Sequence, residues 1–211
     1  MRKPKLNNAQ QSWVRDWWRA LQPRSDGEAA LPGELWAMGR GERAHLRRCS
    51  DAEELLAHAA TLLLAQRLVA LGDGKGSLPD TARSYEQVAW VAGVLAVVKD
   101  DTRDGKSLAF ALGNAAGNER PKMSELRFRS LQRASSVADL FRQWRRAVQL
   151  AGAAVDVARL ADDLLRWQAE LGQAGARASD GVKFHWACDY YLSARERAAT
   201  EEPASNKEIS A

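Results

Sequence analysis

The residues of this 211-residue chain best suited to chemistry are arginines gathered between Lys122 and Arg146. Seven of the 25 residues in this stretch are cationic and two are acidic, a net charge of +5, whereas the whole chain carries +4. Charge focused in this way attracts polyanions, and a guanidinium group can bind a phosphate through two parallel hydrogen bonds. The stretch therefore predicts a phosphate-binding surface. Its cationic residues are Lys122, Arg127, Arg129, Arg133, Arg142, Arg145 and Arg146.

A second group of arginines follows two glycines in the segment GRGERAHLRRC, residues 39–49. Residues four positions apart share one face of a helix, so Arg43 and Arg47 are expected side by side, with Arg48 next to them. A glycine-rich entry into a helix also leaves backbone N–H groups free to bind an anion. The segment is predicted to extend the phosphate-binding surface.

Residues that could catalyse a reaction are scattered along the sequence. The three histidines belong to no HExxH or Cys/His metal motif. The two cysteines have no CxxC partner and are expected as partly buried residues of a protein in a reducing compartment. The acidic pairs fall in an expected turn and on an expected solvated helix face, whereas metal-dependent hydrolysis needs converging carboxylates. We predict no enzyme, no metal site and no cofactor. The residues considered are His45, His58, His185, Cys49, Cys188, Asp100, Asp101, Asp162 and Asp163.

The second half of the basic stretch is predicted to be an amphipathic helix that orients its arginines. Ser136 is expected to cap the helix, and its apolar residues recur on a stripe about 100° wide. Arg142 and Arg146 project to the opposite side, with Arg145 on the flank. Residues 143–154 contain no acidic side chain to neutralise them, unlike an ordinary solvated helix face. The pattern favours ligand binding by these arginines.

Apolar residues spaced three or four positions apart predict helices along nearly the whole chain. No sustained alternation of β-branched residues indicates a strand. The apolar run 88–98 is typical of a helix in the middle of a bundle, and three tryptophans over 13–18 are expected in the core or against a partner protein. We predict an all-α fold, a helical bundle of about eight to nine helices that can divide into two packed sub-bundles. The predicted helices cover about residues 10–22, 39–48, 50–70, 84–99, 106–117, 124–134, 136–151, 156–171 and 182–197.

The chain is expected to form one domain over residues 1–195, with an N-terminal sub-bundle over about 1–118 and a C-terminal one over about 121–195. Residues 198–211 are polar and expected to be disordered. The N-terminus lacks the apolar core of a secretory signal, and the longest apolar run is too short to cross a bilayer. These features predict a cytoplasmic protein.

Five short segments form an ordered series along the chain. They are RAHLRR (43–48), KSLAFALG (106–113), ELRFRSLQRA (125–134), ADLFRQWRR (138–146) and WACDYYL (186–192). Together they resemble the CasB family, the small subunit of the type I-E CRISPR Cascade surveillance complex, and they cover most of residues 40–195. Residues 72–80 and 172–181 look like insertions relative to that family.

The resemblance implies an all-helical, non-catalytic protein without a cofactor. In that family two copies lie beside the crRNA-bearing backbone subunits and hold the target and displaced DNA strands through basic residues, without reading sequence. The implied partners are the backbone and large subunits of Cascade, a second copy of this chain, crRNA-guided target DNA and displaced single-stranded DNA, and no membrane. Lys183 in the last helix joins the implied phosphate contacts.

Two other classes of function remain open. The chain could be a helical scaffold whose basic face docks an acidic protein, and displacement of that protein by single-stranded DNA would count against pure scaffolding. A sequence-specific helix-turn-helix regulator would need base-reading residues at the start of a recognition helix and a palindromic site. The basic helices carry mostly phosphate-type residues, which favours the strand-binding hypothesis.

Overall fold

The computed structural model describes residues 4–24, 27, 29–74, 78–113, 120–171 and 177–201, with side chains as far as residue 192. In this part of the chain there are ten α-helices and one pair of two-residue strands, so the all-α prediction is confirmed. The elements are α1 (Asn8–Ala20), η1 (Gly33–Leu35), α2 (Arg40–Arg48), α3 (Ala52–Leu56), α4 (Ala59–Ala70), α5 (Ala82–Leu95), β1 (Asp100–Asp101), α6 (Leu108–Gly113), α7 (Glu125–Arg133), α8 (Val137–Leu150), β2 (Ala154–Val155), α9 (Val157–Glu170), η2 (Ala178–Asp180) and α10 (Val182–Glu201).

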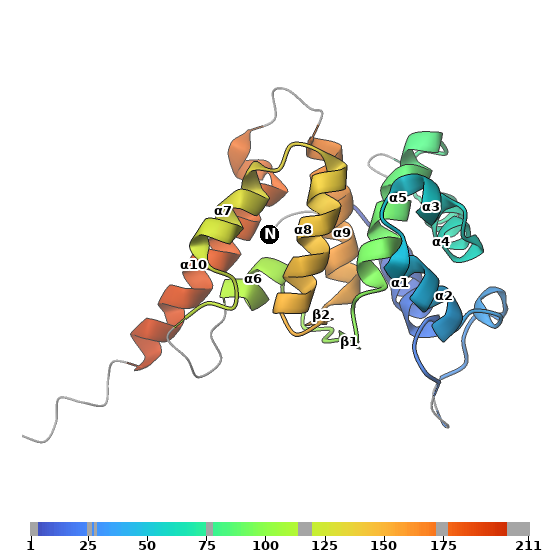
Figure 1. Ribbon diagram of the computed structural model, residues 1–211, viewed down its shortest axis with the longest axis horizontal. Helices are drawn as coiled ribbons and strands as arrows, with labels where there is room; N and C mark the ends of the chain where they lie inside the picture. Colours follow the sequence, from blue (N-terminus) through green and yellow to red (C-terminus); the bar gives the residue numbers. More distant parts are fainter. Residues whose placement is uncertain are drawn as a thin grey trace, which may run out of the picture.

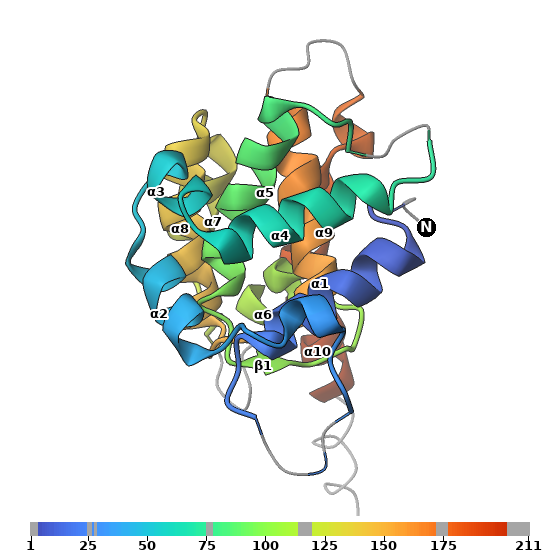
Figure 2. The same ribbon diagram turned by 90° about the vertical axis from the view of Figure 1, so that its right-hand side faces the viewer.

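Helices α5 and α9 lie at the centre of the molecule (Figures 1 and 2). Helix α9 packs against α1, α5 and α10, and α5 packs against α3, α4 and α8. Every residue of the apolar run 88–98 is buried, as its pattern predicted. One cluster of buried hydrophobic residues reaches from Leu6 to Tyr190. A single core therefore holds the helices together, and the division into sub-bundles stays a prediction.

Helix α10 lies at the edge of the molecule beside α6 and α7 (Figure 1). It continues to Glu201, and the rest of the predicted tail, 202–211, lies outside the described residues. No helix in the described part of the chain is long and apolar enough to cross a membrane.

Several predicted helix boundaries are wrong. The single helix expected over 50–70 is two helices, because the chain is extended at His58. The break lets α3 and α4 pack separately on α5, and it is one reason why the described residues form ten helices. Asp51 caps α3 by accepting a hydrogen bond from the backbone N–H of Glu54 at 2.9 Å. Helix α5 begins at Ala82, two residues before the predicted start.

The acidic turn predicted at residues 100–105 begins with a two-residue strand, β1, that the sequence pattern did not predict. Strand β1 pairs in parallel with β2, and two-residue strands are too short to show alternation. Asp101 accepts a hydrogen bond from the N–H of Val157 at 3.0 Å. Arg15 of α1 bridges Asp101 at 3.4 Å and Asp156 at 2.9 Å. These carboxylates therefore fix the start of α9 to α1 and to the mini-sheet.

The prediction that Asp162 and Asp163 lie on a solvated helix face is also wrong, because α9 packs against α1, α5 and α10 and both side chains are buried. Asp162 accepts hydrogen bonds from the backbone N–H groups of Lys5 and Leu6, at 2.5 and 2.7 Å. Asp163 accepts one from the indole Nε1 of Trp186 at 2.8 Å. The pair thus holds the N-terminal segment and α10 onto α9.

Gly93 lets α5 pack closely against Leu55 and Phe141. A Cβ there would lie 2.8 Å from the Phe141 ring and 2.9 Å from Leu55. We expect Gly93→Ala to lower the free energy of unfolding by about 1–2 kcal/mol, since overpacking costs about 1–3 kcal/mol and the gain in helix propensity offsets up to about 1 kcal/mol. Urea unfolding monitored by circular dichroism measures the change. Gly41→Ala in α2 is the matched control: nothing lies within 4 Å of its Cβ, and it should be neutral or stabilising.

Candidate nucleic-acid interface

Helix α7 presents its arginines to solvent because two buried residues fix its opposite face. Phe128 and Leu131 are buried, and the Phe128 ring stacks on that of Tyr190 in α10 with centroids 4.1 Å apart. Arg129 makes an ion pair with Glu125 one turn earlier, at 2.5 Å. The exposed arginines of the helix are Arg127, Arg129 and Arg133.

Helix α8 divides its faces as its sequence predicts. Ser136 caps the helix by accepting a hydrogen bond from the N–H of Asp139 at 3.2 Å. Arg142 is exposed and lies 3.6 Å from Asp139, and Arg146 is exposed as well. The apolar stripe that anchors the helix is Leu140, Phe141, Trp144, Ala147 and Val148.

A groove of about 710 Å³ runs between α7 and α8. Arg127 of α7 and Arg146 of α8 both line it, together with the hydrogen-bonding side chains of Ser130, Gln143 and Gln149. In the described part of the chain, neither arginine has a side-chain hydrogen bond or ion pair. Two free guanidinium groups and several polar side chains suit the oxygens of a phosphate backbone. The other lining residues are Met123, Leu131, Asp139 and Leu150.

Arg145, the third arginine of α8, joins that helix to the end of α2. Its guanidinium donates hydrogen bonds to the backbone carbonyls of Cys49, at 2.9 Å, and Arg47, and it lies 5.1 Å from the centroid of the Phe141 ring. Burial, and then the charge of Arg47, lower the pKa of Arg145 from its ordinary value. Because its donors are engaged by carbonyls, Arg145 positions α2 against α8.

The contact made by Arg145 brings two exposed arginines of α2, Arg47 and Arg48, next to α8. Figure 2 shows α2, α3, α7 and α8 on the same side of the molecule. The two basic segments that the sequence separates by more than 70 residues therefore lie on one side of the fold.

Arg43 caps the end of α5. Its Nε donates to the carbonyl of Ala96 at 3.0 Å and its Nη2 to that of Val98 at 2.8 Å. The last carbonyls of a helix have no partner within the helix, and Arg43 supplies one. Burial, and then the charge of Arg47, lower the pKa of Arg43. The structure thus gives Arg43 a positioning role, and its predicted phosphate contact stays a prediction.

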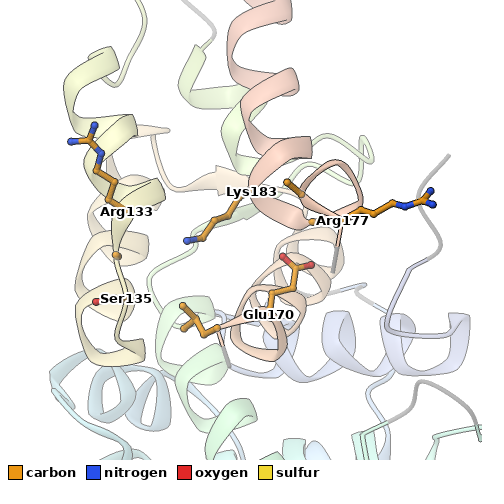
Figure 3. Close-up of a pocket in the computed structure, with 9 residues that line it drawn as sticks. Arg133, Ser135, Glu170, Arg177 and Lys183 are labelled. Carbon is orange, nitrogen blue, oxygen red and sulfur yellow. The ribbon is translucent and has the colours of Figure 1, made fainter. Parts of the chain in front are cut away.

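Lys183 lies in a second pocket, of about 420 Å³, between the end of α7 and the start of α10 (Figure 3). Its side chain points into the pocket, whereas the guanidinium groups of Arg133 and Arg177 point outward. Glu170 accepts hydrogen bonds from the N–H of Val182 at 2.9 and 3.1 Å, so this carboxylate caps α10. The sequence did not indicate Arg177 as a residue of this surface, because one arginine in a segment of small residues forms no basic cluster.

The remaining predicted residue, Lys122, donates from Nζ to the carbonyl of Ala151 at 3.3 Å. The predicted cations thus fall into four groups. Arg43, Arg145 and Lys122 reach backbone carbonyls, Arg129 and Arg142 pair with acids on their own helices, and Lys183 lies in the second pocket. The fourth group is the free arginines. In the part of the chain that the structure describes, five have no recorded side-chain hydrogen bond or ion pair. They are Arg47, Arg48, Arg127, Arg133 and Arg146.

Two histidines that are distant in sequence meet in the fold: the rings of His45 and His58 contact edge to face, with centroids 5.5 Å apart. No group of three or more His, Cys, Asp or Glu residues that could hold a metal ion occurs among the residues whose positions are described. Cys49 is buried and Cys188 is half-buried, and both are free thiols.

Residues 42–191, well over half of the chain, match the family described as CRISPR-associated protein Cse2. The chain belongs to this Cse2 family. The match begins at the basic helix α2 and includes both helices of the groove, and it confirms the resemblance to CasB proteins. Residues 1–41 lie outside it. No curated protein sequence matches the chain.

Solved structures of this family have the same fold. CasB from Thermus thermophilus is 26% identical, with a TM-score of 0.53 over 87% of this chain and 97% of that one. A second structure from Thermus thermophilus, described as a CRISPR-associated protein of the Cse2 family, is 26% identical, with a TM-score of 0.52 over 87% of this chain and 97% of that one. A chain of E. coli Cascade bound to a PAM-containing dsDNA target is 22% identical, with a TM-score of 0.55 over 88% of this chain and 95% of that one.

Proposed function

We propose that this Cse2-family protein is a non-catalytic subunit of a Cascade complex that holds DNA strands by their phosphates and stabilises the R-loop. The observation that carries the proposal is the α7–α8 groove, where Arg127 and Arg146 have no partner among the described residues. Arg47 and Arg48, brought to α8 by Arg145, extend the basic surface. The E. coli Cascade structure that contains a similar chain has a dsDNA target bound, which supports the proposal.

Phosphate contacts are sufficient for this role. Contacts to the backbone position a strand and carry no sequence information, and in RNA-guided complexes base pairing with the guide supplies the specificity. Formation of the R-loop is a nearly balanced exchange of one duplex for another, so that a few protein–backbone contacts shift it. A surface with five arginines that have no side-chain partner among the described residues, on helices that carry mostly phosphate-type residues, fits such a task.

The dependence of binding on salt tests the proposal. If the five free arginines each neutralise one phosphate, the logarithm of the association constant for single-stranded DNA should fall with the logarithm of salt concentration at a slope of about −3.5. Anisotropy titrations of a labelled oligothymidylate with the full chain, at several salt concentrations, measure this slope. Binding that is independent of salt, or no binding at low salt, would contradict the proposal. Binding of an acidic protein partner that single-stranded DNA does not displace would favour the scaffold alternative.

A further inference from the structure

Trp36 differs from every other tryptophan of the chain. All eight lie among the described residues; seven are at most 7% exposed, whereas Trp36 is 63% exposed. The three tryptophans of α1 belong to the core, as their helical spacing predicted. An indole left in water gives up the free energy of burial, and tryptophan is one of the residues enriched at binding interfaces.

The backbone around Trp36 is held in place. Leu35 and Met38, on either side, are buried in the core. The N–H of Trp36 donates to the carbonyl of Gly33 at 3.2 Å, and the N–H of Met38 donates to that of Leu35 at 3.1 Å. The indole is therefore presented to solvent from an anchored turn, which lowers the entropy that a ligand must remove on binding.

Arg24 fixes a positive charge against this indole. Its Cζ lies 5.3 Å from the centroid of the Trp36 ring. The same guanidinium donates hydrogen bonds to the carbonyls of Trp36, at 2.7 Å, and Met38, at 3.2 Å. Arg24 and Trp36 thus form one preorganised unit, an aromatic surface with a cation beside it, which we call the Trp36 platform.

Helix α2 connects the platform to the proposed DNA surface. Helix α2 begins at Arg40, four residues after Trp36, and its other end carries Arg47 and Arg48 beside α8. Nine helical residues span about 13 Å. A strand that follows the basic surface across α8 and along α2 would therefore reach the platform within a few nucleotides.

We propose that the Trp36 platform stacks an unpaired base of the single strand whose phosphates the basic surface holds. This inference rests on the proposed function and adds a second kind of contact to it. Single-strand-binding proteins combine a positive groove with aromatic rings on which bases stack, and stacking does not depend on sequence. A protein partner would need a wider apolar area than one ring, and the two large apolar residues beside Trp36 in its turn, Leu35 and Met38, are buried. The platform lies outside the family match, so it is a feature of this chain's N-terminal region.

Two oligonucleotides separate stacking from phosphate binding. The full chain is titrated with oligothymidylate and with an abasic deoxyribose-phosphate oligomer of equal length. Trp36→Ala should weaken binding of oligothymidylate by about tenfold, should leave binding of the abasic oligomer unchanged and should keep the salt slope. Trp36→Phe should lose less affinity for oligothymidylate than Trp36→Ala does, because a smaller aromatic ring remains. Leu62→Ala, which truncates another exposed apolar side chain on α4, is the matched control and should change neither affinity.

Tryptophan fluorescence gives a second readout, because Trp36 is the ring that a neutral quencher such as acrylamide reaches most easily. Saturating oligothymidylate should protect this emission, and the protection should vanish in Trp36→Phe. The platform is overturned if Trp36→Ala binds oligothymidylate as tightly as the wild type, or if it loses the same affinity for oligothymidylate and for the abasic oligomer. Neither result contradicts the phosphate surface. Protection that appears only when other Cascade subunits are added, and not with oligothymidylate, would identify a protein contact and would also overturn the platform. If Arg127→Glu with Arg146→Glu weakens the binding of neither oligomer, the proposed function itself fails.

Discussion

Charge reversal at Arg127 and Arg146 is expected to weaken the binding of single-stranded DNA by about 100-fold at low salt. A hydrogen bond to a charged group contributes about 1.5–3 kcal/mol, and about 1.4 kcal/mol corresponds to a factor of ten in affinity. Arg127→Glu and Arg146→Glu together should also reduce the steepness of the salt dependence by about 1.4, because two phosphate contacts are lost. Anisotropy titrations over a series of salt concentrations measure both quantities.

The fold should survive this double substitution, since both side chains are exposed and have no hydrogen bond or ion pair in the described part of the chain. Arg67→Glu with Arg83→Glu is the matched control. It lowers the net charge by the same amount, and these exposed residues belong to α4 and α5, across the molecule from α7 (Figure 1). If the control weakens DNA binding as much as the groove variant does, net charge rather than the groove is responsible, and the proposed site is wrong.

Asp163→Ala is expected to lower the free energy of unfolding by about 3 kcal/mol. The carboxylate is 0% exposed and accepts a hydrogen bond from the Trp186 indole at 2.8 Å. Arg159 lies 3.3 Å from it. Removing one member of a buried pair costs about 3–5 kcal/mol, and the partial exposure of Arg159 places the expected value near the lower limit. Urea unfolding, with the midpoint and slope fitted together, measures the loss.

Asp163→Asn separates the two contributions to this loss. Its amide oxygen still accepts the indole hydrogen bond, whereas its interaction with the Arg159 guanidinium is weaker, so it should be less destabilising than alanine. Asp180→Ala, at an exposed carboxylate of η2, is the control and should change stability by less than about 0.5 kcal/mol. If Asp163→Ala lowers stability by as little as this control, the carboxylate is solvated, as the sequence pattern suggested. That result would contradict the packing of α9 against α10.

The candidate site illustrates why the sequence predicted a surface but not the role of each cation. The charge of the basic stretch and the apolar stripe of α8 are properties of one helix, so they can be read from residues a few positions apart. The partner of a guanidinium group is not local: Arg145 donates to a carbonyl 96 positions away, and Arg43 to carbonyls 53 and 55 positions away. From spacing alone, both arginines look the same as Arg146.

The burial of Asp162 and Asp163 and the exposure of Trp36 could not be predicted from the sequence either, because both depend on contacts between distant parts of the chain. Asp162 and Asp163 look solvated in the sequence, and the structure buries them because α10 and the N-terminal segment cover the outer side of α9. Trp36 has no helical pattern around it, and its exposure results from the anchoring of its neighbours, Leu35 and Met38.

The sequence by itself determined the all-α class, the central apolar helix, the cap of α8, the family resemblance and the position of the basic stretch. These follow from helical periodicity, capping and charge, which act over one or two turns of a helix. The tertiary structure decided where helices break, which carboxylates are buried and which arginines remain free on the surface of α2, α7 and α8. Those outcomes depend on contacts between residues far apart in the chain, and they exist only once the core has packed.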